Sequence, residues 1–464
     1  MALGLALGLA ACGSDDAPPA SVDTDATTST TDPGTADTTE GPPDDALTWW
    51  RDVEPIVRAK CAGCHRPGEV APFSLETHAD FVAFSAAAAW AIESGAMPPW
   101  GVDDTCNDYR DPLSLTPEQR EVLLRYVDDA LMPEGDPADA TPPEPPPPAL
   151  VPDVVLEMPE AYTPSLAEPD DYRCFTIPWP QDLAEDRFVT GLEIYPGETS
   201  IVHHVIVYAI EAGNEGFYLD LEDADPGPGY TCFGGPGKTD GTARWVGAWV
   251  PGQQPFSAPE GVGQRISPGT TLVMQVHYNV ALGAALADRS SIGLSLSPSV
   301  ERRAHIMPLA ELAWLASDGS MLIPAGDPSV VHEATFDRTH PILAAGLLGE
   351  LGVPADTPLE IWNVGFHMHN LGTQGRLDLV DPGGDSACLL DIYRWDFEWQ
   401  RSYDLVQPVR FDADQQVHLR CQWDNSANNQ PVVDGQPLEP ADVDWGDGTL
   451  DEMCLGILYV STAR

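Results

Sequence analysis

A proline-rich segment in the first third of the chain divides the sequence into two parts with different patterns. Six of the seven residues from Pro142 to Pro148 are proline. Proline fixes φ and has no backbone N–H, so this segment cannot form a helix interior or a central strand. We predict an extended spacer over residues 138–153, with a separately folded region on each side.

The region after the spacer has the pattern of an all-β protein. Short runs rich in Val, Ile, Leu and aromatic residues are interrupted by Pro-Gly, Gly-Gly, Asp-Gly and Asn-containing turns. Helical periods are few, so we predict β-sandwich architecture. We place the domain boundary in the turn-rich stretch near Pro298, which gives two all-β domains over residues 154–297 and 298–464.

The region before the spacer, residues 47–137, has helical signals at both ends. Apolar residues recur at helical spacing from Trp49 to Val57. Thr116 and Gln119 form a capping-box pattern with Pro117 at the first helical position, and an apolar helical face follows. We predict a small all-α domain here.

A C-x-x-C-H motif lies between these two predicted helices. Cys61 and Cys64 have the spacing that lets two thiols add to the haem vinyl groups, and the adjacent His65 would be the proximal iron ligand. A redox C-x-x-C pair or half of a zinc site are alternative interpretations of so short a motif.

The arrangement of helices around this motif resembles a class I cytochrome c. The resemblance implies haem c bound covalently at Cys61 and Cys64, with His65 as one axial ligand. It also implies that Met97, in a proline-stiffened loop, is the other axial ligand. His78 or an open coordination position are the alternatives to Met97.

The N-terminus has the features of an exported protein. A short apolar run ends in Leu9-Ala10-Ala11-Cys12, which resembles a bacterial lipoprotein signal over residues 1–12 with Cys12 as the lipidated residue. A plain secretory signal is the alternative. Residues 13–46 contain nine acidic residues and no basic residue, which predicts a disordered acidic linker.

Export and charge together restrict the partners. We predict a periplasmic or cell-surface lipoprotein of a bacterium, in a compartment where disulfides persist, with a lipid anchor as its only membrane contact. The chain has 73 acidic and 22 basic residues, which argues against nucleic-acid binding.

Four motifs in the β region carry candidate metal ligands. His203 and His204 are neighbours on a predicted strand, so they share one metal only at a bulge or strand end. His277 lies alone in a second strand. His367 and His369 alternate, which places both imidazoles on one face about 7 Å apart. Met453 precedes the last apolar run.

Taken in this order, the four motifs resemble the copper type II ascorbate-dependent monooxygenases. The resemblance implies two jelly-roll-like sandwich domains with one copper ion each. His203, His204 and His277 would bind the electron-transfer copper. His367, His369 and Met453 would be the catalytic residues, binding the copper that uses O2. A thioether ligand agrees with Cu(I). The family pattern also implies a Cys421–Cys454 disulfide.

Three positions depart from the peptide-amidating relatives. Those enzymes have an Arg two residues before the H-x-H motif, and an Asn and a Tyr after the copper Met. Here Gly365, Leu455 and Ile457 occupy these positions. We expect an apolar pocket at that end and a substrate that is not a peptide α-carboxylate.

The predicted function is that of an exported copper-dependent monooxygenase. It would hydroxylate a C–H bond of a small organic substrate with O2, and its own haem would relay electrons from an external donor. The alternative is a non-catalytic lipoprotein that binds copper or transfers electrons through copper and haem.

Overall fold

The computed structural model describes residues 46–464, apart from 68, 70, 144–148, 168–169, 233, 239–240, 281–285, 434, 447 and 449. The chain divides into two compact units, Met1–Ala46 and Leu47–Arg464, and the second is described below. The predicted signal with Cys12, the acidic linker up to residue 45 and most of the proline run lie outside the described residues.

Three α-helices and two short helical turns precede the β region. The turns are Trp49–Val53 (η1, a π-helix) and Pro137–Asp139 (η2, 3-10), and the helices are Glu54–Lys60 (α1), His78–Ser94 (α2) and Pro117–Asp128 (α3). The capping box at Thr116 and Gln119 is present. Trp49, Phe81 and Tyr126 are at the centre of a small core that these helices share.

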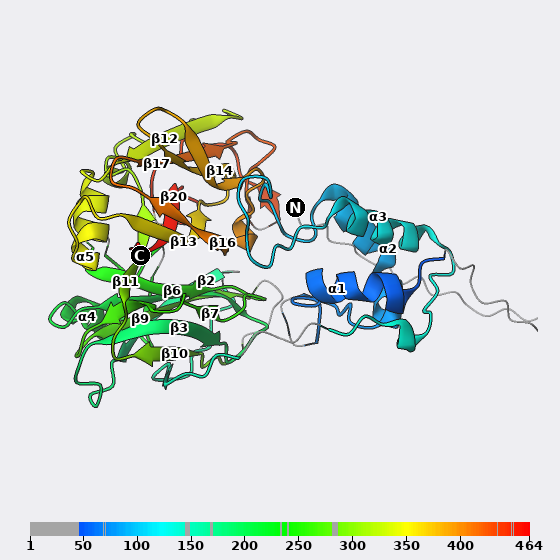
Figure 1. Ribbon diagram of the computed structural model, residues 1–464, viewed down its shortest axis with the longest axis horizontal. Helices are drawn as coiled ribbons and strands as arrows, with labels where there is room; N and C mark the ends of the chain where they lie inside the picture. The colour runs from blue at the N-terminus through cyan, green and yellow to red at the C-terminus, as the bar shows by residue number, and fades with distance from the viewer. Residues whose placement is uncertain are drawn as a thin grey trace, which may run out of the picture. The chain divides into compact units, whose positions relative to one another are not determined.

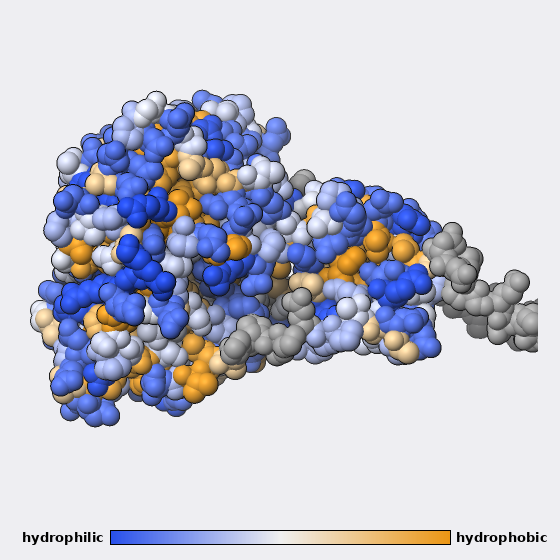
Figure 2. All heavy atoms as spheres, in the orientation of Figure 1, coloured by the Kyte–Doolittle hydropathy of each residue, from blue (hydrophilic) through white to orange (hydrophobic). Residues whose placement is uncertain are grey.

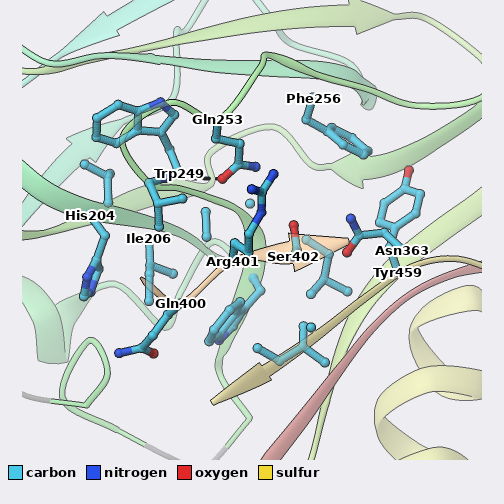
Figure 3. Close-up of a pocket in the computed structure, with 18 of the residues that line it drawn as sticks. His204, Ile206, Trp249, Gln253, Phe256, Asn363, Gln400, Arg401, Ser402 and Tyr459 are labelled. Carbon is cyan, nitrogen blue, oxygen red and sulfur yellow. Dashed lines mark hydrogen bonds between the residues drawn. The ribbon is translucent and has the colours of Figure 1, made fainter. Parts of the chain in front are cut away.

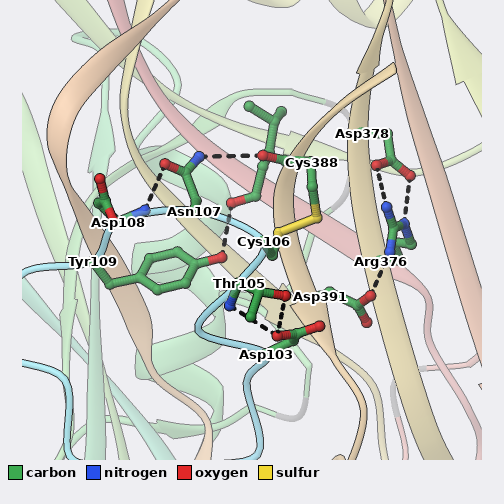
Figure 4. Close-up of a disulfide and its surroundings, with 11 residues drawn as sticks. Asp103, Thr105, Cys106, Asn107, Asp108, Tyr109, Arg376, Asp378, Cys388 and Asp391 are labelled. Atoms are coloured by element: carbon green, nitrogen blue, oxygen red, sulfur yellow. Dashed lines mark hydrogen bonds and ion pairs between the residues drawn. A yellow bond between two sulfur atoms is a disulfide. The ribbon is translucent and has the colours of Figure 1, made fainter. Parts of the chain in front are cut away.

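The predicted all-α cytochrome c domain is wrong. Helices make up 18% of the structure, and residues 100–111, which we call the strap, leave the helices and join the C-terminal β region. Trp100, Val102 and Tyr109 are buried in the core of that region. The Tyr109 hydroxyl donates to the Leu389 carbonyl oxygen at 3.1 Å, as Figure 4 shows. Local sequence patterns identify the helices, but they cannot show contacts to strands about 280 residues later.

Among its described residues, the first half of the β region contains ten strands and one helix. Its strands are Val154–Glu157 (β1), Asp170–Pro178 (β2), Arg187–Tyr195 (β3), Val202–Ile210 (β4), Tyr230–Thr231 (β5), Ala243–Trp249 (β6), Phe256–Ser257 (β7), Val262–Ile266 (β8), Thr271–Asn279 (β9) and Ser291–Ser297 (β10), and its helix is Gly216–Ala224 (α4). Five of these strands form a sheet in the order β5-β2-β9-β4-β6.

The second half, where the structure describes it, contains the remaining ten strands. They are Arg302–Leu309 (β11), Val330–Phe336 (β12), Leu359–His367 (β13), Gly372–Val380 (β14), Ser386–Ile392 (β15), Ser402–Phe411 (β16), Gln416–Trp423 (β17), Val432–Val433 (β18), Gln436–Pro437 (β19) and Leu455–Thr462 (β20). Four helical segments accompany them, Trp314–Ala316 (η3), Ile342–Leu348 (η4), Gly349–Leu351 (α5) and Phe397–Trp399 (η5). A four-stranded sheet, β12-β17-β14-β15, supplies one layer of this half.

One long sheet runs through both halves. Its strand order is β1-β10-β3-β8-β11-β20-β13-β16, with β7 paired to β3. The halves join where β8 pairs with β11 in parallel, Val262 opposite Arg302 and Gln264 opposite Ala304. Figure 1 shows β11 beside the green strands of the first half. The mainly β-sandwich architecture agrees with the prediction for the region after the spacer.

Three disulfides are present among the described residues: Cys106–Cys388, Cys174–Cys232 and Cys421–Cys454. They are typical of proteins in oxidising compartments, which agrees with export. Hydrophilic residues cover much of the face in Figure 2. Within the described part of the chain, no helix combines the length and apolar character needed to span a membrane.

Candidate metal centres

Three histidines from β4 and β9 meet in the first half of the β region. His204 lies opposite His277 in the antiparallel pairing of these strands. The register shifts between Val202 and His204, so His203 sits at an irregularity of β4. This is the bulge that adjacent strand residues need if both are to reach one site. The structure therefore brings His203, His204 and His277 together.

The three imidazoles face one another through the same ring nitrogen. The Nδ1 of His203 lies 3.4 Å from that of His204 and 3.1 Å from that of His277, and the remaining Nδ1 pair is 3.2 Å apart. Metal–nitrogen bonds of about 2.0 Å in tetrahedral directions put nitrogens about 3.3 Å apart. The observed spacing fits one metal ion held by three Nδ1 atoms.

Carboxylates contact the outer nitrogens of two of these rings. Asp170 Oδ1 lies 2.8 Å from His277 Nε2, and Glu398 Oε2 lies 3.4 Å from His203 Nε2. A carboxylate that accepts the Nε2 proton leaves the Nδ1 lone pair free for a metal. Tyr172 stacks on the His277 ring at 4.0 Å and restricts its orientation.

Burial favours the neutral form of His204 and His277. It lowers the pKa of both His204 and His277 well below the ordinary value, and the neighbouring imidazoles lower it further. A neutral imidazole is the form that binds a metal.

The second candidate centre lies at the end of β13. The rings of His367 and His369 are 5.0 Å apart. His369 Nδ1 lies 2.9 Å from the Asp451 carbonyl oxygen, and His367 Nδ1 contacts Gln400 Oε1. Both Nδ1 atoms are therefore occupied, which leaves both Nε2 atoms for a metal. Burial, with a smaller contribution from His367, lowers the pKa of His369 to about 3.

Met453 lies beside the turn that carries His369. His367 pairs with Leu455 across β13 and β20, so the antiparallel register continued by two residues places Met453 opposite His369. Met453 is 3% exposed, and Cys421–Cys454 fixes the residue after it. The ligand role of Met453 stays a prediction.

The buried Glu452 connects the two chain segments of this centre. Its carboxylate accepts hydrogen bonds from the His369 N–H at 2.9 Å, the Leu371 N–H at 2.6 Å and the Trp423 indole N–H at 2.9 Å. Two donors belong to the turn after His367, and Glu452 itself precedes Met453. Glu452 therefore positions the second centre.

A cavity of about 130 Å³ is lined by one histidine of each set, His204 and His367. Figure 3 shows many of its lining residues, with His204 and Gln400 at one side and Tyr459 at the other. Gly365 and Ile457 lie in its wall, as does His367. Most of the other lining side chains are apolar: Leu192, Val205, Ile206, Trp245, Val246, Trp249, Val250, Phe256, Ile306 and Phe366.

The C-x-x-C-H motif follows α1. Cys61 and Cys64 are free thiols, and burial raises the pKa of Cys61 to about 12. His65 Nδ1 lies 3.1 Å from the Phe73 carbonyl oxygen, which leaves its Nε2 free. A histidine that donates one ring N–H to a carbonyl is in the usual state of a metal-binding imidazole. This environment suits an axial ligand.

Met97 follows α2, and its backbone N–H donates to the Ala91 carbonyl oxygen at 3.1 Å. No contact found in the described part of the chain joins Met97 to His65, so its axial role stays a prediction. His78, the alternative, has its Nε2 2.9 Å from the Met132 carbonyl oxygen.

Sequence reasoning missed the residues around the imidazoles. Glu398 and Gln400 lie in and just after η5, a segment with no metal motif, and they contact histidines of different halves. Asp170 pairs with Asn279, two residues after His277, across β2 and β9. Knowledge of the strand pairing was needed to find it.

Comparisons with known proteins bear on the first half of the β region. No curated protein matches the chain. Among solved structures, the major capsid protein P2 of bacteriophage PM2 matches with 8% identity and a TM-score of 0.24, covering 67% of this chain and 97% of that one. A putative secreted protein of Parabacteroides distasonis matches with 8% identity and a TM-score of 0.15, covering 67% and 88%. These scores support no inference.

A family model gives the informative match. Residues 154–284 match the copper type II ascorbate-dependent monooxygenase N-terminal domain. The matched range contains His203, His204 and His277, whose Nδ1 atoms converge. The match to this domain, together with the convergent histidines, supports a relationship between this chain and the copper type II ascorbate-dependent monooxygenases.

Proposed function

We propose that the protein is a copper-dependent monooxygenase that hydroxylates a C–H bond of a small organic substrate. The observation that supports this most is that two sets of imidazoles reach one cavity, through His204 of the first set, which converges at Nδ1, and His367 of the second set, whose Nε2 remains for a metal. Copper bound at these sites would supply one-electron redox chemistry and activation of O2. The net reaction is R–H + O2 + 2 electrons + 2 protons → R–OH + water.

The residues of the chain have separate roles in this proposal. His203, His204 and His277 hold the electron-transfer copper. His367, His369 and Met453 hold the copper at which O2 is used. Asp170, Gln400 and Glu452 fix the ring orientations and the turn geometry. The apolar cavity wall limits water around the reacting C–H bond.

Labelled oxygen tests the proposal. The copper-loaded chain is incubated with a reductant, ¹⁸O2 and a library of small organic compounds, and products are scored by incorporation of one labelled atom. We expect Met453→Ile to abolish incorporation, whereas Met321→Ile, an equally buried core substitution, retains it. Copper binding with no incorporation from any compound would instead favour the non-catalytic alternative.

We further propose that the C-x-x-C-H motif binds haem c and relays electrons to the first copper, although the segment is not an all-α cytochrome domain. Cys64 lies close to the loop that follows β6, since a Cβ placed on Gly252 would be 2.9 Å from its sulfur. Val250 and Gln253 of that loop line the cavity. The motif is therefore next to the cavity wall.

Two measurements test the relay. Purified protein from a host with haem c maturation is expected to show covalent haem, and the Cys61→Ala, Cys64→Ala double variant is expected to lack it. After rapid mixing of the reduced protein with O2, haem oxidation is expected to coincide with re-reduction of Cu(II). A haem that stays reduced while copper turns over would disprove the relay.

We also propose export with a lipid on Cys12. The three disulfides agree with an oxidising compartment. Mass spectrometry of the N-terminal peptide from membrane fractions tests this, with Cys12→Ala expected to release the protein into the soluble fraction.

A further inference from the structure

We propose that Arg401 is the anchor for an anionic group in the cavity, and that the ligand is a small apolar carboxylate. This inference rests on the proposed function, because it names the substrate class of the same cavity. Arg401 immediately precedes β16 and lines the cavity, and Figure 3 shows its side chain extending among the lining residues toward Gln253.

No carboxylate pairs with Arg401 among the described residues, where its charge contacts aromatic rings instead. The guanidinium forms no ion pair or hydrogen bond there, and its Nε is buried without a hydrogen-bond partner. A buried donor left unpaired costs about 1–3 kcal/mol, so native structures usually pair it. Arg302 and Arg244 also have a buried Nε without a hydrogen-bond partner, but each has a carboxylate near its guanidinium, Glu360 for Arg302 and Glu211 and Glu350 for Arg244.

Aromatic rings restrict the position of the guanidinium. Its central carbon lies 5.3 Å from the Trp100 ring centroid and 5.9 Å from the Tyr403 ring centroid. Trp100 and Tyr403 themselves pack edge to face at 5.2 Å. A planar guanidinium restricted in this way is suited to pair with a carboxylate through two parallel N–H donors.

The other residues that line the cavity indicate the polarity and size of the rest of the ligand. Trp249, Ile206, Phe366 and Ile457 present apolar surface. A cavity of about 150 Å³ is large enough for benzene, so the 130 Å³ here suits an apolar body about one ring in size. Gln400, the residue before Arg401, contacts His367 Nδ1 of the second metal set. Because Arg401 and His367 line the same cavity, a carboxylate on Arg401 keeps the apolar body in the cavity that His367 faces.

Calorimetry on the metal-free full-length chain tests this assignment. Phenylacetate is titrated in parallel with phenylacetamide, which has the same size and no charge. We expect the acid to bind at least tenfold more tightly than the amide. Arg401→Gln is expected to lower the affinity for the acid to that for the amide, without changing the affinity for the amide. Arg401→Lys is expected to keep part of the preference for the acid. Arg410→Gln is the control, because Arg410 lies in β16, the strand that follows Arg401, and pairs with Asp412.

A second variant tests the location independently of Arg401. Ile457→Phe places a larger side chain in the cavity and is expected to weaken the binding of both compounds at least tenfold. Equal binding of acid and amide to the wild-type chain would overturn the proposal, as would full acid binding by Arg401→Gln or no binding of either compound. Without copper, the outcome does not depend on whether the protein is a hydroxylase.

Discussion

At the scale of single residues, outer contacts decide which nitrogen each histidine offers to a metal. His277 turns Nε2 toward Asp170, so its Nδ1 faces His203 and His204. His369 turns Nδ1 toward the Asp451 carbonyl oxygen, so its Nε2 remains free. The histidines of both sets lie on strands or at a strand end, but the first set offers Nδ1 to a metal and the second set offers Nε2.

Asp170→Asn tests whether the carboxylate on His277 Nε2 determines which ring nitrogen His277 offers to a metal. We expect about tenfold weaker copper binding at the first set, because loss of the carboxylate weakens the preference for the Nε2-protonated ring. Competition with a copper chelator measures the affinity. Asp171→Asn is the matched control, since Asp171 accepts from the Tyr162 hydroxyl and contacts no histidine of the set. Equal affinities in both variants would contradict the role of Asp170.

His305 gives a pH prediction unrelated to the metal sites. Burial lowers its pKa to about 3, with a smaller contribution from Arg244. The unfolded histidine has a pKa near 6.5, so between these values the unfolded state binds more protons. Stability is therefore lost as the pH falls from about 6.5 toward 3.

At pH 5 we expect His305 to account for about 2 kcal/mol of the lost unfolding free energy. Urea unfolding of the wild-type chain and His305→Leu at pH 7 and pH 5 measures it. The variant is expected to lose less stability between the two pH values. An identical loss in both proteins would show that His305 is not the titrating group.

At the scale of elements, the strap shows why part of the fold escaped sequence analysis. Alternating apolar residues predict strands, and the Thr116 capping box predicts α3, because these signals are local. Adjacent His203 and His204 can share one metal only if β4 is irregular at this point. The sequence gives that condition but does not show that the irregularity is present. The burial of Trp100 and Tyr109 against β15 and β16 depends on tertiary contacts, and no local period reports it.

Gly101→Ala tests how tightly the strap is fitted. A Cβ on Gly101 would lie 2.0 Å from the Arg394 carbonyl oxygen. This oxygen belongs to the main chain, so it cannot move away as easily as the end of a flexible side chain. The Gly101 carbonyl oxygen also accepts from the Tyr393 N–H at 2.9 Å. We expect a loss of about 1–3 kcal/mol in unfolding free energy and faster proteolysis within residues 100–111. Gly383→Ala, where nothing lies within 4 Å, should have little effect on either measurement.

At the scale of the whole molecule, the long sheet joins the two halves of the β region. Backbone pairing of β8 with β11 crosses the predicted boundary near residue 298, and the Arg302 guanidinium also crosses it by donating to the Glu260 carbonyl oxygen at 3.4 Å. The sequence predicts two sandwiches, but it does not reveal that they share a sheet, because parallel pairing between distant strands has no local signature.

We expect the two halves to unfold together for this reason. Scanning calorimetry of the metal-free chain should give one transition for residues 154–464, since neither half can lose its sheet without exposing a strand edge of the other. Copper added in amounts that fill only the first set should raise the temperature of the whole transition. Two separate transitions, with copper shifting one alone, would contradict this coupling.

The shared sheet also limits how the cavity can admit a molecule. A hinge near residue 298 would have to break the ladder between Arg302 and Val262 before the two histidine sets could separate. If both sets hold copper as proposed, main-chain geometry fixes the distance between the two ions. Entry of a molecule then depends on rotation of the side chains that line the cavity, so enlarging those side chains should slow ligand arrival and departure alike.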